Sequence, residues 1–156
     1  MNMEEKVVAA LQQKGYHIAF AESCTAGLAA ARLVNVASAS TVLDVSFVTY
    51  ANEAKMRYVG VSADSLSRYG AVSEQVAGEM AEGVAQAAGS TVGVGISGIA
   101  GPSGGSAEKP VGTVCFGFFV EGILHTCTQH FGNLGRQAVR AAAVDFVYER
   151  LCALLD

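Results

Sequence analysis

The sequence lacks the patterns of a membrane-spanning or secreted chain. No apolar run approaches the ~20 residues that a membrane-spanning helix requires. Residues Met1–Val8 (MNMEEKVV) have neither the basic start nor the apolar stretch of a secretion signal. We therefore expect a cytoplasmic protein that binds no membrane.

Patterns of metal ligands and of disulfides are missing as well. The sequence has four cysteines without a CxxC pair, and its three histidines are scattered. Isolated cysteines in a reducing compartment usually pack as small hydrophobic side chains. We expect no metal, no cofactor and no disulfide. The residues concerned are Cys24, Cys115, Cys127, Cys152, His17, His125 and His130.

Basic stretches are also absent and the net charge is −4 at neutral pH, so nothing indicates a nucleic-acid partner. With 51% hydrophobic and 15% charged residues, the composition is that of a folded chain. The 156 residues suffice for a hydrophobic core, and we expect one domain over residues 1–156. The apolar composition of so small a domain favours a homo-oligomer, such as a dimer.

Hydrophobic spacing and turn residues predict helices that alternate with strands. Asn52 and Ser73 are expected to cap helices, and Gly15 and Gly89 to end them. The predicted helices are Glu4–Lys14, Thr25–Val36, Glu53–Tyr58, Ser62–Tyr69, Glu74–Ala88 and Arg136–Leu155. The predicted strands are Tyr16–Ala21, Val42–Tyr50, Thr91–Ser97, Thr113–Val120 and Ile123–Phe131.

This order of elements predicts an α/β fold with three layers, α/β/α, around a mixed, mostly parallel sheet. Only Glu121-Gly122 separates the last two strands, which indicates a C-terminal β-hairpin of undetermined turn type. Strands separated by helices are expected to be parallel, so the first three share one carboxyl-terminal edge, where open α/β sheets bind ligands. That edge would receive Glu22–Thr25, Tyr50–Asn52 and the glycine-rich loop Gly98–Gly112.

Ser23 stands at a predicted strand-to-helix junction, where free backbone N–H groups favour developing negative charge. It is a candidate nucleophile for acyl transfer, with N–H groups near Cys24 and Thr25 as an oxyanion hole. Alternatively, Ser23 or Thr25 only caps the helix. Cys24 is a rival nucleophile, because a helix N-terminus lowers a thiol pKa, although a buried structural cysteine is the commoner case.

Lys55 lies in the first turn of a predicted helix, where a lysine opposes the helix dipole. It is a candidate general base, because burial near positive charge lowers a lysine pKa. The alternative is a solvated surface lysine. Tyr50, at the predicted strand end, could hold Lys55 or the substrate, or it could be an ordinary half-buried aromatic residue.

Glycines in the loop Gly98–Gly112 allow a ligand to approach the backbone, whose amides could bind phosphate. The loop is neither a Walker loop nor a GxGxxG motif, and it could equally be a flexible surface loop. Arg136 and Arg140, one helical turn apart, could face a phosphate together. The glycines concerned are Gly98, Gly101, Gly104 and Gly105.

Five segments resemble the CinA C-terminal domain family, in the family's order and over the chain from about Glu4 onward. The stand-alone members of this family, of the PncC type, are nicotinamide mononucleotide deamidases. The segments are AESCTAG (Ala21–Gly27), FVTYANEAK (Phe47–Lys55), GAVSE (Gly70–Glu74), SGIAGPSGGSAEKPVGTV (Ser97–Val114) and GRQAVR (Gly135–Arg140).

The resemblance implies hydrolysis of nicotinamide mononucleotide to nicotinate mononucleotide and ammonia, without a metal. It implies a serine nucleophile at Ser23 with a lysine partner at Lys55, and it places the motif tyrosine at Tyr50. We expect the small-molecule substrate to be bound by Thr25, Ser97, Gly98, Gly101, Gly104, Gly105, Arg136 and Arg140.

Three residues depart from the family pattern: Ala26 and Ser46 stand where glycine is common, and Ala51 where serine is common. None of them removes a proposed catalytic residue. Two other interpretations stay open, a non-catalytic nucleotide-binding or regulatory module and an amidase that depends on Cys24. Binding alone requires neither Ser23 nor Lys55, and no histidine is well placed to activate Cys24.

Overall fold

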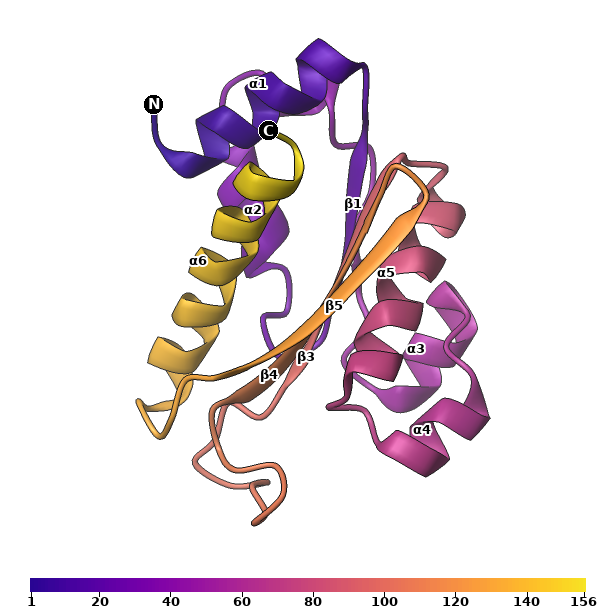
Figure 1. Ribbon diagram of the computed structural model, residues 1–156, viewed down its shortest axis with the longest axis vertical. Helices are drawn as coiled ribbons and strands as arrows, with labels where there is room; N and C mark the ends of the chain where they lie inside the picture. The colour runs from indigo at the N-terminus through magenta and orange to yellow at the C-terminus, as the bar shows by residue number, and fades with distance from the viewer.

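A five-stranded sheet forms the middle layer of the computed structural model, which describes residues 1–156 (Figure 1). The strand order is β2-β1-β3-β4-β5. β1 pairs in parallel with β2 and β3, whereas β4 is antiparallel to β3 and to β5, so only β4 runs against the others. The mixed, mostly parallel sheet is confirmed. Its strands are β1 (Ile18–Glu22), β2 (Phe47–Val48), β3 (Val92–Gly98), β4 (Thr113–Val120) and β5 (Ile123–His130).

Helices cover both faces of the sheet, as the three-layer prediction requires (Figure 1). One face carries α1 (Met3–Lys14), α2 (Leu28–Val34) and α6 (Arg136–Leu154). The other carries α3 (Asn52–Val59), α4 (Ala63–Tyr69) and α5 (Glu74–Ala88). A short 3₁₀ helix, η1 (Ala39–Thr41), follows α2. No helix combines the length and the apolar composition needed to cross a membrane.

The larger hydrophobic core lies between the sheet and the α1, α2 and α6 layer, and a smaller one lies under α3 and α5. α5 packs close to the sheet because glycines face it. A Cβ atom on Gly95 would come within 2.2 Å of the Ala77 carbonyl oxygen, and one on Gly117 within 2.3 Å of the same atom. Side chains at these two positions would push α5 off the strands.

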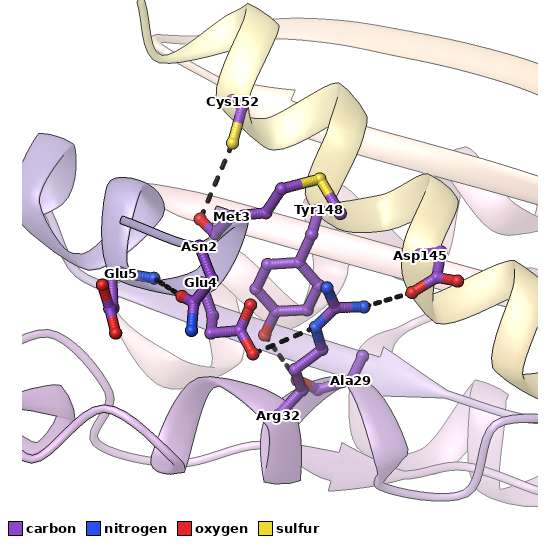
Figure 2. Close-up of polar contacts among 9 residues, drawn as sticks. All are labelled: Asn2, Met3, Glu4, Glu5, Ala29, Arg32, Asp145, Tyr148 and Cys152. Carbon is purple, nitrogen blue, oxygen red and sulfur yellow. Dashed lines mark hydrogen bonds and ion pairs between the residues drawn. The ribbon is translucent and has the colours of Figure 1, made fainter.

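Contacts between α6 and α2 hold the larger layer together (Figure 2). The buried Tyr148 of α6 donates its hydroxyl proton to the Ala29 carbonyl at 2.6 Å. Arg32 of α2 pairs with Asp145 of α6 and, at 3.3 Å, with Glu4 of α1. The Arg32 guanidinium also lies 4.9 Å from the centre of the Tyr148 ring. These contacts fix the middle of α6 relative to α2.

One predicted helix has the predicted bounds, and the predicted hairpin has its turn at the predicted residues. Helix α5 spans Glu74–Ala88, with Ser73 accepting the Val76 N–H at its start and the left-handed Gly89 at its end. The hairpin of β4 and β5 also turns at Glu121-Gly122, and both residues have positive φ, at 54° and 77°. That geometry is a type I′ turn, which matches the twist of the two strands.

The helix predicted over Thr25–Val36 is wrong at its start, because α2 begins only at Leu28. The Ala26 N–H donates to the Ser23 carbonyl in a tight turn. Ala26 and Gly27 then both take positive φ, at 48° and 98°, which no right-handed helix accommodates. Ser23 therefore lies on a turn that precedes the helix.

The second strand is also shorter than predicted, since Val42–Tyr50 contributes only Phe47–Val48 and an isolated bridge at Leu43. The side chain of Ser46 replaces a backbone partner, because its Oγ accepts the Phe20 N–H at 2.9 Å. The departure from the family's glycine at this position thus supplies a hydrogen bond to β1.

Smaller differences concern the ends of elements. The prediction that Asn52 caps α3 is wrong, because α3 begins at Asn52 and Ala51 precedes it without a side-chain bond. β1 begins at Ile18 and includes Glu22, and β5 ends before Phe131. None of these shifts moves a candidate residue to another face of the sheet.

Candidate active site

Ser23 follows directly after β1, at the carboxyl-terminal edge of the sheet. Its N–H donates to the Ile96 carbonyl of β3 at 3.0 Å, which continues the parallel pairing by one residue. Ser23 therefore lies beside the end of β3, where Ser97 and Gly98 are located. Its side chain is half-buried and is accessible from the surface.

Lys55 reaches Ser23 from the first turn of α3. Its Nζ donates to Ser23 Oγ at 3.1 Å and to the Tyr50 carbonyl oxygen at 2.9 Å. Ser23 Oγ in turn donates to the same carbonyl at 3.3 Å. Lys55 is only 1% exposed and forms no ion pair with any carboxylate. The sequence left a solvated lysine as an alternative, and the structure removes it.

Burial favours the neutral form of both groups beside Ser23, the Lys55 amine and the Cys24 thiol, and therefore shifts their pKa values in opposite directions. Burial lowers the pKa of Lys55, an effect that the nearby Cys24 only partly opposes. Burial raises the pKa of the Cys24 thiol to about 11, although the charges of Arg140 and Lys55 act against it. A buried amine with a lowered pKa can accept a proton, whereas Cys24 stays a neutral thiol at physiological pH.

Tyr50 contributes to the site through two different groups. Its carbonyl contacts the Ser23–Lys55 pair, whereas its ring is exposed and points its hydroxyl at Arg136. Arg136 Nη2 donates to that hydroxyl at 3.0 Å, and Nη1 donates to the Gly101 carbonyl at 2.8 Å. The predicted arginine, tyrosine and glycine loop are thus joined next to the serine.

Arg140 faces the turn after Ser23. Its Nε donates to the Cys24 carbonyl at 2.8 Å, and its Nη2 donates to the Thr25 carbonyl at 3.3 Å. Thr25 itself is fully buried and donates its hydroxyl proton to Glu22 at 2.7 Å. Arg136 and Arg140 therefore start from the same helical face and bind different partners.

One part of the glycine loop contacts the residues around Ser23, and another part does not. Gly98 ends β3, and a Cβ there would lie 2.7 Å from the Val114 side chain, so this glycine serves strand packing. Gly101 is buried under Arg136, as described above. Gly104 and Gly105 are exposed, and they form no hydrogen bond with Ser23, Lys55 or either arginine. Ser97 is buried beside Ser23 and opposite Cys115 of β4.

The sequence placed Glu22 at this edge of the sheet but did not predict its role. Its carboxylate is 1% exposed and accepts the N–H groups of Ala29 and Ala30, at 2.9 and 3.0 Å, besides the Thr25 hydroxyl. It therefore caps α2 from six residues before the start of the helix, which helix-capping patterns do not cover because they involve residues next to the helix. The signal available was an acidic residue at the end of an apolar strand.

No group of three or more His, Cys, Asp or Glu side chains gathers as metal ligands would. The five surface cavities are also lined by other residues than Ser23 and Lys55. The pair is reached instead from the open surface at Ser23. The arrangement offers a hydroxyl, a buried amine and free backbone N–H groups, which are the components of serine-dependent acyl transfer.

Comparisons with known proteins agree on one family. The model of the CinA C-terminal domain matches residues 1–155. Nicotinamide-nucleotide amidohydrolase PncC of Enterobacter agglomerans is 53% identical over 142 residues, which cover 90% of this chain and 86% of that protein. The CinA-like protein of Kosmotoga olearia is 45% identical over 99% of this chain, but the chain spans only 38% of that longer relative.

Solved structures have the same fold. The crystal structure of a competence or damage-inducible protein from Enterobacter asburiae superposes with a TM-score of 0.94 at 36% identity, and it covers 99% of this chain and 96% of that one. The competence/damage inducible protein CihA from Agrobacterium tumefaciens gives a TM-score of 0.92 at 39% identity, with 99% and 96% covered.

Proposed function

The chain belongs to the CinA C-terminal domain family, and from this premise we propose that it hydrolyses nicotinamide mononucleotide to nicotinate mononucleotide and ammonia. Its class as an amidohydrolase rests on the 53% identity with nicotinamide-nucleotide amidohydrolase PncC. The observation that supports the mechanism is the 3.1 Å contact between the buried Lys55 amine and Ser23 Oγ.

In the proposed mechanism Ser23 Oγ attacks the carboxamide carbon while the neutral Lys55 amine takes the hydroxyl proton. The carbonyl oxygen becomes an oxyanion, and unpaired backbone N–H groups of the Ser23 turn stabilise it. The C–N bond then breaks as the Lys55 ammonium gives its proton to the departing amide nitrogen, which leaves as ammonia. Water then attacks the acyl-enzyme while the Lys55 amine takes its proton. Lys55 returns that proton to Ser23 Oγ as nicotinate mononucleotide leaves.

The proposed substrate contacts lie around this pair. Arg136, on the exposed side of Tyr50, is the cation proposed to bind the phosphate, with backbone amides of the glycine loop beside it. Binding energy from the phosphate would hold the carboxamide against Ser23. The further contacts proposed are Thr25, Ser97, Gly98, Gly101, Gly104, Gly105 and Arg140. The chain is proposed to act as one domain, in the cytoplasm and as a homo-oligomer.

The test is an assay of the purified chain with nicotinamide mononucleotide, in which ammonia and nicotinate mononucleotide are measured together. We expect equimolar release of both, in the presence of a chelator as well, and little ammonia from free nicotinamide. Equal turnover of free nicotinamide would contradict phosphate anchoring. Binding of the nucleotide in a calorimeter without release of ammonia would favour the non-catalytic binding module.

A further inference from the structure

Arg140 binds two successive carbonyl groups of the turn that carries Ser23, from a helix more than a hundred residues away in the sequence. Its Nε and Nη2 are both occupied by the Cys24 and Thr25 carbonyls, so only Nη1 has no partner in the protein. An arginine that presents its guanidinium fork to backbone carbonyls orients peptide groups, because the fork has a fixed planar geometry.

The orientation of these peptide groups decides where their N–H groups point. In a trans peptide the C=O and the following N–H point in opposite directions. The Cys24 carbonyl points at Arg140, so the Thr25 N–H points away from Arg140. Neither the Cys24 nor the Thr25 N–H donates to any acceptor in the protein, although both belong to a turn of buried residues. Unpaired buried N–H groups are rare and call for an acceptor.

Glu22 holds the same turn through other groups. The Glu22 carboxylate accepts the Thr25 hydroxyl proton and the first N–H groups of α2, so it fixes the Thr25 side chain. Arg140 fixes the Thr25 and Cys24 carbonyls. The peptide group between Cys24 and Thr25 is therefore restrained at both of its ends, and its N–H, which belongs to a fully buried residue, has no acceptor in the protein.

We infer that Arg140 is a positioning residue, which fixes the turn after Ser23 and with it the direction of the unpaired N–H groups of this turn that are to face the oxyanion. This inference rests on the proposed amide hydrolysis. It replaces the substrate contact proposed for Arg140 by a role in positioning the Ser23 turn, and it leaves the phosphate to Arg136. Loss of one oxyanion-hole donor lowers kcat by about 10²–10³-fold in other enzymes, so a misplaced donor should lower it by at least about 10-fold.

The experiment compares Arg140→Lys and Arg140→Gln with a matched control, Arg32→Gln. Arg32 is also a half-buried arginine between α2 and α6, but it pairs with carboxylates (Figure 2). It forms no hydrogen bond with the Ser23 turn. The control therefore reports what a loosened α6 does by itself. Melting temperatures of all variants are measured alongside kcat and KM for nicotinamide mononucleotide and for nicotinamide riboside, which lacks the phosphate.

Arg140→Lys keeps the charge and loses the fork, so we expect kcat to fall at least about 10-fold for both substrates, with KM nearly unchanged. Arg32→Gln should lower the melting temperature and keep kcat within about twofold. A rise in KM for the nucleotide alone, with the riboside unaffected, would overturn the inference and make Arg140 a phosphate ligand. Equal losses of kcat in the Arg32 and Arg140 variants would also overturn it.

A second readout isolates the oxyanion. Replacing the carboxamide oxygen by sulfur, in thionicotinamide mononucleotide, weakens the hydrogen bonds that an oxyanion hole makes, because sulfur is a weak acceptor. We expect the wild type and Arg32→Gln to prefer the oxygen substrate by the same factor, and Arg140→Lys to lose most of that preference. If Arg140→Lys preferred the oxygen substrate as strongly as the wild type does, the inference would be contradicted. Turnover by the wild type would still support the proposed function. A wild type without turnover would overturn both.

Discussion

Lys55 Nζ lies 3.1 Å from Ser23 Oγ and has no carboxylate partner anywhere in the structure. A buried lysine without a counter-ion is costly when it is charged, so folding favours its neutral form. The neutral form is the one that can take a proton from serine. The same burial that lowers the stability of the charged state therefore prepares the chemistry.

The stability cost of charged Lys55 gives a prediction that does not depend on activity. The folded-state pKa of Lys55 is lowered below its unfolded value near 10.4, so folding is penalised at pH values below the folded pKa. The penalty shrinks as the pH rises from the folded pKa to the unfolded one. The free energy of unfolding of Lys55→Met, relative to that of the wild type, should therefore be higher near pH 7 than near pH 10. Denaturant unfolding at a series of pH values measures this difference, and a constant difference would contradict it.

The choice of nucleophile is tested by single substitutions at neighbouring positions. Ser23→Ala should reduce ammonia release to background, because no other hydroxyl contacts Lys55. Cys24→Ala should retain activity within a few-fold, since burial keeps the Cys24 thiol neutral. Steady-state assays with melting temperatures of both variants provide the measurement. The reverse pattern would make the chain a cysteine amidase.

Arg136 is predicted to anchor the phosphate. Loss of one charge-assisted hydrogen bond is worth about 1.5–3 kcal/mol, so Arg136→Gln should raise KM for nicotinamide mononucleotide about 10-fold or more. KM for nicotinamide riboside should change little. Tyr50→Phe is the control, because it removes the Tyr50–Arg136 hydrogen bond and keeps the charge. If Tyr50→Phe raised KM as much, Arg136 would act by holding Tyr50.

Ala26 stores strain in the turn after Ser23. A φ of 48° costs a residue with a Cβ about 1–2 kcal/mol. A glycine at this position would avoid that cost, but its greater conformational freedom in the unfolded chain would offset part of the gain. Ala26→Gly should therefore raise the free energy of unfolding by about 0.5–1 kcal/mol, or the melting temperature by about 1–4 °C. Ala31→Gly, on the exposed face of α2, should lower stability by about 1 kcal/mol. Equal destabilisation by both substitutions would show that Ala26 is unstrained.

Local signals predicted those parts of the fold that local interactions determine. The cap at Ser73 and the stop at Gly89 predicted α5 to the residue, and the Glu121-Gly122 pair predicted the hairpin. The meeting of Ser23 and Lys55 was also predictable, because parallel strands bring their carboxyl ends to one edge.

Tertiary contacts determined the parts that were predicted incorrectly. An alanine-rich segment predicted a helix from Thr25, but Glu22 binds the hydroxyl of that residue and Arg140 binds its carbonyl, and both hold it in a turn. The second strand was predicted too long because the Ser46 side chain takes a backbone position that only the folded β1 offers. Spacing placed Arg136 and Arg140 on one helical face, where both could bind a phosphate, and could not indicate that Arg140 binds backbone carbonyls.

The most direct test of the Ser23–Lys55 mechanism is ammonia release from nicotinamide mononucleotide by Lys55→Met and Lys55→Arg, measured as kcat and KM over a range of pH. Loss of an acid–base group should lower kcat by at least about 10²-fold in Lys55→Met, with a smaller change in KM. Lys55→Arg should be no better, because a guanidinium stays protonated and cannot take the serine proton. In the wild type, kcat/KM should rise with pH through the lowered pKa of Lys55. Near-full activity of Lys55→Arg would contradict the account, since Lys55 would then supply only a positive charge.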